Sequence, residues 1–322
     1  MAHQQHSPTN SGFGATSTTN DVLADIDLAG RRFLVTGSSG GLGLETSRAL
    51  ASRGATVVMA ARDSTKNSAA AATIESTVQG ADLELLTVDL GSLASVRRAT
   101  RELLDDGRAL HGLIANAGIM ATPFALTVDG FESQFGVDHL GHFLLVRELL
   151  PLLVAGAPSR VVCVSSAGHR MGDIDFDDVN FDRRPYEPFL AYGAAKTANV
   201  LHAVALDQMF RDRGVRAFAV HPGVIQTELG RYMTPEVVGT LMARISERSE
   251  AMVWKSPEQG AATSVWAATS PLLEGRGGEY CEDVEVSPVV ADDAPDGIGV
   301  AARAVDPERA RQLWALSERL VG

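Results

Sequence analysis

Two side chains that can exchange protons with a substrate stand four positions apart in the run AYGAAKTANV. They are Tyr192 and Lys196, and residues at i and i+4 share one face of a helix. A free phenol has a pKa of about 10, and a nearby positive charge lowers that pKa because it stabilises the phenolate. The spacing therefore predicts a tyrosine that exchanges a proton with a substrate oxygen near neutral pH.

A third polar side chain can act on the same substrate oxygen. Ser166 ends the apolar run RVVCVSS, which is predicted to be a strand. Open α/β sheets bind ligands at the carboxyl ends of their strands, so the Ser166 hydroxyl is expected beside the tyrosine. Small residues around Tyr192 and Lys196 would let a cofactor approach closely: Gly193, Ala194, Ala195 and Ala198.

A glycine-rich loop, TGSSGGLG at 36–43, follows the strand RFLVTG and opens a helix. Glycines let the backbone turn tightly and approach a pyrophosphate, while the helix N-terminus offers free N–H groups. This context predicts a dinucleotide site, although the spacing is G-x3-G-x-G. The residues expected to contact the dinucleotide here are Gly37, Ser39, Gly41, Leu42 and Gly43.

The end of the second predicted strand bears on the choice between NAD and NADP. An acidic residue there would hold both ribose hydroxyls and favour NAD. The chain instead has Ala61 and then Arg62, whose guanidinium suits a 2′-phosphate. Asp63 argues the other way, and an ordinary solvated Arg-Asp turn is the alternative to both. We expect NADP, with NAD the less favoured cofactor.

The elements that must position these residues alternate along the chain. Continuous β-branched runs predict strands buried on both faces, and helical patterns lie between them. Such alternation gives a single-domain, Rossmann-type α/β fold with a doubly wound parallel sheet of about seven strands. The strands are expected at 32–37, 56–62, 83–90, 111–118, 160–166, 215–223 and 277–282, and helices at 44–53, 130–153 and 191–213.

Composition limits the functions that are open to the chain. It has 322 residues, is 45% hydrophobic and carries a net charge of −12, which disfavours nucleic-acid binding. No apolar run reaches the roughly 20 residues of an integral membrane segment, and no signal peptide is recognisable. Cys163 and Cys281 fit a reduced, cytoplasmic protein better than a disulfide framework.

The region from 31 to 320 resembles the short-chain dehydrogenase/reductase family. Six motifs appear in the family's order: TGSSGGLG, VDL with Asp89, ANAG at 115–118, VSS ending in Ser166, Y-x3-K and HPG at 221–223. AARD, HLGHF, the 25 residues between Ser166 and Tyr192, and KTANVL resemble the branch that contains retinol dehydrogenases and protochlorophyllide reductases.

The resemblance implies a role for each matching residue. Ser166 would orient the substrate, Tyr192 would be the acid/base, and Lys196 would hold the ribose hydroxyls and tune Tyr192. Asp89 would contact the adenine amino group and Asn116 would line the cofactor floor. The other cofactor contacts implied are Leu90, Ala117 and Gly118, and at the nicotinamide end Pro222, Gly223, Val224 and Thr227.

One position departs from the family pattern. The family has asparagine before HLGHF as part of a proton relay, and this chain has Asp138. That asparagine works largely through its main-chain carbonyl, so Asp138 is retained as a catalytic candidate that affects the rate. His139 and His142 beside it could suggest a metal site, but their apolar surroundings favour a packed helix and no metal is expected.

The chain is expected to divide into a disordered N-terminal tail at 1–21 and one catalytic domain at 22–322. Substrate loops are expected at about 167–190 and 226–256. The second contains apolar residues at helical spacing, which favour core packing and allow a lid over a lipophilic substrate. Homo-oligomers are common in the family through the two long helices, and the sequence does not decide the oligomeric state.

The expected function is NADP-dependent hydride transfer between nicotinamide and a carbonyl or alcohol, as in a carbonyl reductase. The partner is a small molecule, expected to be a lipophilic aldehyde, ketone or alcohol. Two alternatives stay open: a reductase of enone C=C bonds with the same fold, and a non-catalytic NADP-binding sensor or scaffold. Intact Ser166, Tyr192 and Lys196 argue against the sensor.

Overall fold

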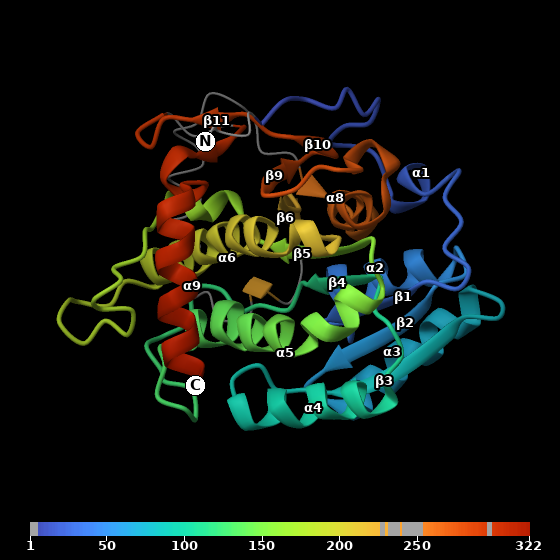
Figure 1. Cartoon of the computed structure of the whole chain (residues 1–322), viewed down its shortest axis with the longest axis horizontal. Coiled ribbons are helices and arrows are strands. Elements are labelled where there is room, and N and C mark those ends of the chain that lie inside the picture. Colours follow the sequence, from blue (N-terminus) through green and yellow to red (C-terminus); the bar gives the residue numbers. More distant parts are fainter. Residues whose placement is uncertain (1–5, 226–228, 231–238, 240–253, 295–297) are drawn as a thin grey trace.

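The computed structural model describes the chain except residues 1–5, 226–228, 231–238, 240–253 and 295–297. Thr227 and most of the predicted substrate loop 226–256 therefore lie outside the described residues. A central sheet runs through the molecule with helices on both faces (Figure 1). This arrangement is the doubly wound α/β fold that the strand–helix alternation predicts.

The main sheet has eight strands in the order β10-β9-β6-β5-β4-β1-β2-β3. All neighbouring pairs are parallel except β10 with β9, so the edge strand β10 adds to the seven strands expected from the sequence. The strands are β1 (Arg32–Thr36), β2 (Thr56–Ala61), β3 (Asp82–Thr87), β4 (Gly112–Ala115), β5 (Ser159–Val164), β6 (Val215–His221), β9 (Glu279–Glu282) and β10 (Glu285–Val286).

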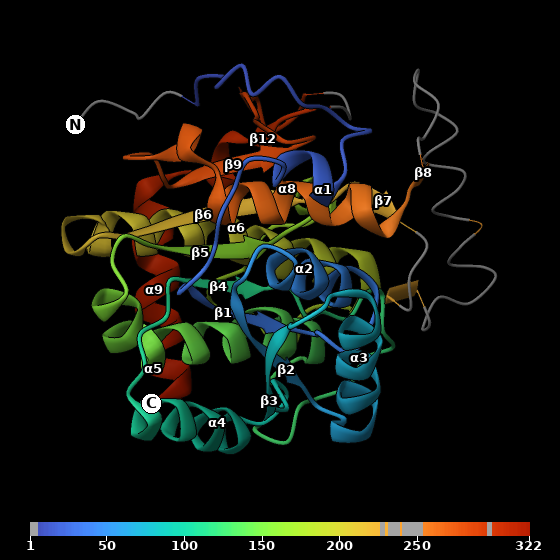
Figure 2. The same cartoon turned by 90° about the vertical axis from the view of Figure 1, so that its right-hand side faces the viewer.

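Side chains alternate between two apolar cores, one on each face of the sheet. On β1, Leu34 belongs to one core, whereas Phe33 and Val35 belong to the other. The first core is completed by helices α4 (Leu93–Asp106), α5 (Gly141–Ala155), α6 (Pro188–Phe210) and α9 (Pro307–Val321). The second is completed by α1 (Thr19–Val22), α2 (Gly41–Ala51), α3 (Ser64–Thr77) and α8 (Pro257–Thr269), on the opposite side of the sheet (Figure 2).

Short elements lie around the sheet. A π-helix, η1 (Phe135–Leu140), leads into α5, and a 3₁₀ turn, η2 (Ala167–Arg170), follows β5. Two small parallel pairs stand apart from the main sheet: β7 (Val224–Ile225) with β8 (Trp254–Lys255), and β11 (Val289–Val290) with β12 (Val300–Ala301). No helix within the described part of the chain is long and apolar enough to cross a bilayer.

Part of the segment predicted as a disordered tail contacts the sheet edge. The Glu285 carboxylate of β10 accepts the Thr9 and Ser11 backbone N–H groups at 2.6 and 3.0 Å. The His6 imidazole accepts the Tyr280 N–H at 3.1 Å. Composition is a property of the segment alone, so it cannot predict hydrogen bonds between this segment and residues far away in the chain.

Candidate functional site

Helix α6 carries Tyr192 and Lys196. The helix begins at Pro188, and the Glu187 side chain caps it by accepting the Leu190 N–H at 2.6 Å. Both functional residues are buried, and the Lys196 Nζ lies 5.4 Å from the centroid of the Tyr192 ring. The four-residue spacing thus places the phenol and the ammonium together, as predicted from the sequence.

Ser166 lies beside this pair at the carboxyl end of β5. Its Oγ accepts the Gly168 N–H at 3.0 Å, which caps the turn η2. A Cβ on Gly168 would lie 2.8 Å from the Tyr192 ring, so a glycine is needed for the turn to pack against the tyrosine. The Ser166 hydroxyl is near enough to the Tyr192 phenol to lower its pKa. The structure therefore brings Ser166, Tyr192 and Lys196 into one cluster.

The protein environment acts on the Tyr192 phenol in two directions. Burial raises the pKa of Tyr192, and the Asp138 carboxylate raises it further. The Lys196 ammonium and the Ser166 hydroxyl lower it, but burial is the larger effect and the net pKa lies above its ordinary value. The expected lowering counted the positive nicotinamide ring as well as the lysine; in the protein alone, desolvation outweighs the charge of the lysine.

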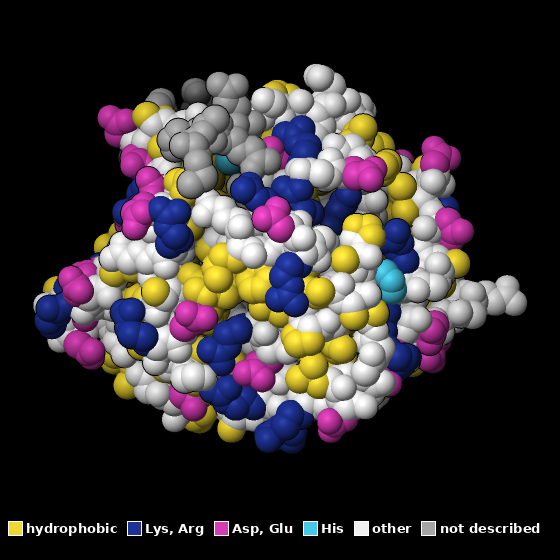
Figure 3. Space-filling model, viewed as in Figure 1, with side chains coloured by type: hydrophobic (Ala, Val, Ile, Leu, Met, Phe, Trp, Pro, Cys, Tyr) yellow, Lys and Arg dark blue, Asp and Glu magenta, His cyan; other side chains and the backbone are white. Residues whose placement is uncertain are grey.

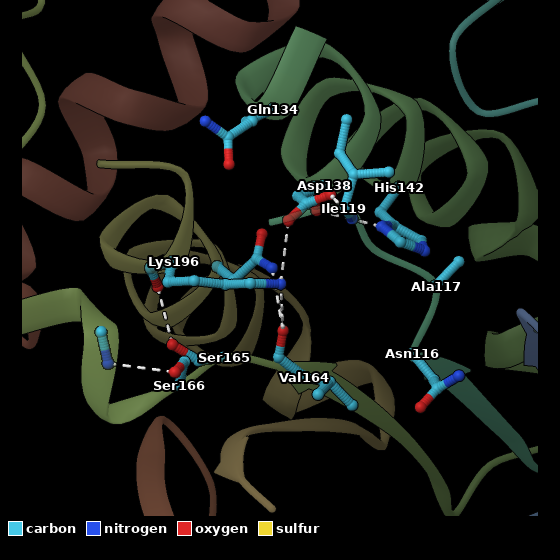
Figure 4. Close-up of polar contacts among 12 residues, drawn as sticks. Asn116, Ala117, Ile119, Gln134, Asp138, His142, Val164, Ser165, Ser166 and Lys196 are labelled. Carbon is cyan, nitrogen blue, oxygen red and sulfur yellow. Dashed lines mark hydrogen bonds and ion pairs between the residues drawn. The ribbon is translucent and has the colours of Figure 1, made fainter. Parts of the chain in front are cut away.

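Asp138 sits on the π-helix η1 and faces Lys196 (Figure 4). Its Oδ2 lies 3.1 Å from the Lys196 Nζ, and its Oδ1 accepts the Ile119 N–H at 2.9 Å. Burial lowers the pKa of Lys196, but the Asp138 carboxylate and Tyr192 outweigh it and the net pKa is raised. The carboxylate thus keeps Lys196 charged.

A chain of hydrogen bonds connects Asp138 to the dinucleotide loop. The His142 Nδ1 bonds the main-chain oxygen of Asp138 at 3.0 Å, and its Nε2 lies 2.8 Å from the Thr36 Oγ1. The same Thr36 oxygen accepts the N–H groups of Asn116 and Ala117. His142 therefore packs the helix against the sheet. His139 bonds Ser317 instead, and no group of metal-ligating side chains occurs in the described ranges.

The predicted dinucleotide loop is held tightly against β4. Gly37 has φ 69°, and a Cβ on Gly43 would lie 2.2 Å from the Gly37 oxygen and 2.7 Å from the Asn116 Nδ2. The Asn116 amide also donates to the Thr36 carbonyl at 2.8 Å. The loop backbone therefore packs closely against β4, and its glycines have no side chains to keep a ligand away. This arrangement fits a pyrophosphate at the N-terminus of α2.

The adenosine end of the predicted site shows separate roles for Arg62 and Asp63. The Asp63 carboxylate accepts the Lys66 N–H at 3.0 Å and caps α3. Arg62 is exposed at the end of β2, and its guanidinium has no hydrogen-bond or ion-pair partner among the described residues. Beyond β3, the Asp89 Oδ1 accepts the Gly91 N–H at 2.9 Å, and the adjacent Leu90 is buried.

The predicted nicotinamide end follows β6. Gly223 has φ 96°, and a Cβ there would lie 2.6 Å from the Lys255 side chain. Lys255 in turn pairs with Asp283 at 2.5 Å, and Val224 begins β7 next to Pro222 and Gly223. Sequence reasoning missed Lys255, because only the β7–β8 pairing brings it to this position.

Sequence reasoning also missed a polar cluster that joins two loops of the site. The Gln134 amide donates to the Tyr186 hydroxyl at 2.8 Å and to the Pro188 carbonyl at 2.9 Å, and its oxygen accepts the Ala121 N–H. The buried Glu132 lies 3.2 Å from the same hydroxyl. The cluster connects the segment after β4 with the start of α6, and no local motif marks it.

Comparison with known proteins places this site in a family. The family model for short chain dehydrogenase matches residues 31–237. The chain is 41% identical over 315 residues to the short-chain dehydrogenase/reductase prx1 of Penicillium roqueforti, covering 95% of this chain and 91% of that protein. It is 39% identical over 298 residues to human retinol dehydrogenase 13, covering 92% and 86%.

Solved structures agree with these relatives. A crystal structure of an uncharacterized protein from Mycobacterium paratuberculosis has a TM-score of 0.73 and 37% identity, with 95% of this chain and 97% of that chain covered. The RhlG/NADP active-site complex of Pseudomonas aeruginosa has a TM-score of 0.62 and 26% identity, with 80% and 96% covered. The chain belongs to the short-chain dehydrogenase/reductase family and is an NAD(P)-dependent oxidoreductase.

Proposed function

We propose that this enzyme uses NADP to interconvert a carbonyl and an alcohol, and that its substrate is a lipophilic aldehyde, ketone or alcohol. The observation that carries the proposal is the cluster of half-buried Ser166 with the buried Tyr192 and Lys196, beside a glycine loop. Tyr192 as acid/base group, Ser166 as hydrogen-bond donor and the Lys196 cation can then act together at the substrate oxygen.

Two observations support NADP over NAD. Asp63 caps α3 and is therefore engaged away from the adenosine ribose, whereas Arg62 is exposed at the end of β2. A guanidinium at this position suits a 2′-phosphate. The RhlG complex, whose title names NADP, is a structural neighbour of this chain.

The lipophilic substrate class rests on the relatives and on the residues around the cluster. Human retinol dehydrogenase 13 carries an apolar polyene alcohol in its name, and it is 39% identical to this chain. Met171 lies close to Gly168 next to the Tyr192 ring, and Ile119 and Met120 follow the ANAG motif. Met171 thus places an apolar side chain near the Tyr192 ring, and a lipophilic substrate suits such a lining.

The residues divide the chemistry as follows. A bound nicotinamide supplies the hydride for reduction and accepts it in oxidation. Ser166 donates a hydrogen bond to the substrate oxygen, and Tyr192 delivers the proton that converts this oxygen to a hydroxyl. Lys196 stabilises the phenolate that Tyr192 leaves behind, and Asp138 holds Lys196 in its charged state. Asn116 maintains the floor of the site by joining β4 to β1.

The Tyr192→Phe variant tests the acid/base assignment. We expect kcat for carbonyl reduction to fall by about 100-fold or more, because the proton donor is lost. The Kd for NADPH should stay within about twofold of the unaltered enzyme's, since the ring remains. Stopped-flow turnover and NADPH fluorescence titration measure the two quantities. Undiminished turnover would refute the mechanism, and turnover of enones without ketones would favour the C=C reductase.

The Arg62→Ser variant tests the cofactor assignment. Loss of a charge-assisted contact costs about 1.5–3 kcal/mol, so the Kd for NADPH should rise by about 10- to 100-fold while that for NADH changes little. Arg101→Ser, an exposed arginine on α4, is the matched control and should change neither. An unchanged ratio of the two Kd values in Arg62→Ser would rule out Arg62 as the phosphate contact.

A further inference from the structure

His169 is a buried histidine that lies three residues after Ser166 and has no exposed surface. Its Nδ1 is 2.7 Å from the Ser166 main-chain oxygen, and its Nε2 is 3.1 Å from the Ala301 nitrogen of β12. The imidazole therefore bridges the catalytic turn η2 and a strand more than a hundred residues later in the chain.

The two partners determine which imidazole nitrogen carries the proton. A backbone N–H can only donate, so the Nε2 facing Ala301 must be the nitrogen without a hydrogen. A carbonyl oxygen can only accept, so the Nδ1 facing Ser166 must carry the hydrogen. Burial is the largest effect on the ring and lowers the pKa of His169 to about 4, which keeps it neutral at pH 7.

The backbone of His169 is anchored as firmly as its ring. Its carbonyl accepts the Thr197 hydroxyl at 2.9 Å and an Arg303 N–H at 3.1 Å. Thr197 directly follows Lys196 on α6, so one residue ties the serine turn to the catalytic helix. The His169 N–H donates to the same Ser166 oxygen at 3.0 Å. The Ser166 carbonyl thus receives two hydrogen bonds from His169.

This arrangement controls the direction of the Ser166 side chain. Two donors fix the plane of its carbonyl, and the Gly168 N–H occupies a lone pair of its Oγ at 3.0 Å. The Ser166 O–H is then left to point toward Tyr192 and the substrate oxygen. A rotation of the serine backbone would move this hydroxyl, and misplacement by about 1 Å can cost up to about 100-fold in rate.

We infer that His169 is a positioning residue for Ser166. This role needs the Nδ1–H tautomer of the imidazole, which strand β12 sets. The inference deepens the proposed function and rests on it, since Ser166 matters only if it contacts the substrate oxygen. His169 itself contacts Ser166 and Ala301 and lies behind the turn. Its effect should therefore appear in kcat and leave cofactor binding unchanged.

Two substitutions separate the two hydrogen bonds of the ring. In His169→Asn the amide nitrogen occupies the place of Nδ1 and can still donate to Ser166. In His169→Gln the amide reaches toward Ala301 and the bond to Ser166 is lost. We expect kcat of the Asn variant to stay within about threefold of normal and that of the Gln variant to fall by about 10- to 100-fold. The Kd for NADPH should change less than about twofold in both.

His202→Gln is the matched control, because it removes another buried imidazole, one that lies beside Cys163. It should leave kcat near its normal value, and thermal melts of all three variants monitor folding. Equal losses of kcat in the Asn and Gln variants, or no loss in either, would overturn the inference. A kcat that is retained in His169→Asn and lost in His169→Gln would support the inference. A purely structural role predicts that the shorter Asn side chain would not preserve kcat.

A measurement that does not need activity keeps this inference distinct from the proposed function. Long-range ¹⁵N–¹H spectra of histidine-labelled enzyme report the tautomer of each ring, and the His169→Asn variant identifies the signal of His169. We expect the Nδ1–H tautomer at pH 7, and an Nε2–H ring or an imidazolium would overturn the inference. If the unaltered enzyme reduced none of the carbonyls tested, the proposed function would fail. The spectra would still show which nitrogen of His169 carries the hydrogen.

Discussion

Lys196 is a charged group with almost no contact with solvent, and Asp138 is the acid that balances it. Their side chains are 4% and 0% exposed, and Nζ and Oδ2 are 3.1 Å apart. Removing two charges from water is costly, so such a pair persists only where close contact and further hydrogen bonds compensate. The Ile119 N–H and the Val164 carbonyl provide these bonds.

Asp138→Asn should shift the pH dependence of the enzyme downward. The carboxylate raises the pKa of Tyr192 directly, and it also offsets the charge of Lys196 that lowers it. In the pH range where Lys196 stays protonated, loss of the carboxylate leaves the ammonium to act undiminished on the phenolate, and the pKa of Tyr192 falls. We expect the acid limb of kcat/KM for alcohol oxidation, which needs the phenolate, to move down by about 0.5–1 pH unit. Initial rates from pH 5 to 10 measure the shift.

The matched control for this prediction is Asp207→Asn. Asp207 is also buried and pairs with a cation, Arg216, at 2.7 Å, but that pair lies where β6 begins, away from the carboxyl edge. Its pH profile should match that of the unaltered enzyme. If the pH profile of Asp138→Asn coincides with those of Asp207→Asn and the unaltered enzyme, Asp138 does not influence the pKa of Tyr192.

At the scale of elements, α9 covers the two long helices on one face of the sheet. It crosses α6 and α5 in both views (Figures 1 and 2). Trp314 of α9 packs at 4.9 Å from Phe143 of α5 and at 6.0 Å from the rings of His202 and Phe210 of α6. These are the helices through which the family resemblance leads us to expect oligomers, and in this chain their outer face is occupied by α9.

Trp314→Ala should destabilise the protein strongly. The indole is 6% exposed and joins α9 to the core, and truncation of a buried aromatic ring typically costs about 3–5 kcal/mol. We expect the free energy of unfolding in urea to fall by this amount with an unchanged m-value. Arg311→Ala, on the same helix but 57% exposed, should change it by less than about 0.5 kcal/mol. Similar small losses in both variants would show that α9 is only loosely docked.

In the whole molecule, charged side chains are spread over the surface. The interior contains histidines whose imidazoles are uncharged. Acidic and basic side chains are interspersed on the face that carries α9, with no large area of one sign (Figure 3). Inside the protein, burial lowers the pKa of His142 to about 4 and that of His202 to about 3. The pKa of His139 is shifted well below its ordinary value for the same reason.

These histidines make stability sensitive to acid. Their pKa in the folded state lies below the unfolded value of about 6.5, so the unfolded state binds more protons below that pH. Stability is therefore lost as pH falls from 6.5 toward 4. Burial raises the pKa of Glu132, Glu279 and Glu282, which acts in the opposite direction because the folded state then binds more protons at these three groups. The net direction is a loss.

We expect the free energy of unfolding in urea to drop by more than about 3 kcal/mol between pH 7 and pH 5. In His202→Gln one of these sites is gone, and the slope against pH should be smaller by up to about 1.36 kcal/mol per pH unit. A flat stability profile across this range would contradict the assignment of buried, neutral histidines. An unchanged slope in the variant would exclude His202 as a contributor.

Much of this molecule follows from local sequence patterns. Runs rich in apolar and β-branched residues predict the central strands β1, β2, β5 and β6, since a strand buried on both faces is apolar along most of its length. The glycine loop and the Tyr192/Lys196 spacing depend only on backbone conformations and helical periodicity. The family and the reaction class are therefore predictable from the order and spacing of these motifs.

Other features depend on contacts between residues far apart in the chain, which no local pattern encodes. The ion pair of Asp138 with Lys196, the bridge from His169 to Ala301 and the packing of α9 on α5 and α6 are of this kind. So is the direction of the Tyr192 pKa, which depends on how much water the surrounding fold excludes. Residue types and their spacing identify the groups that can do chemistry. Their partners and charge states depend on tertiary packing, because desolvation and long-range hydrogen bonds exist only in the folded chain.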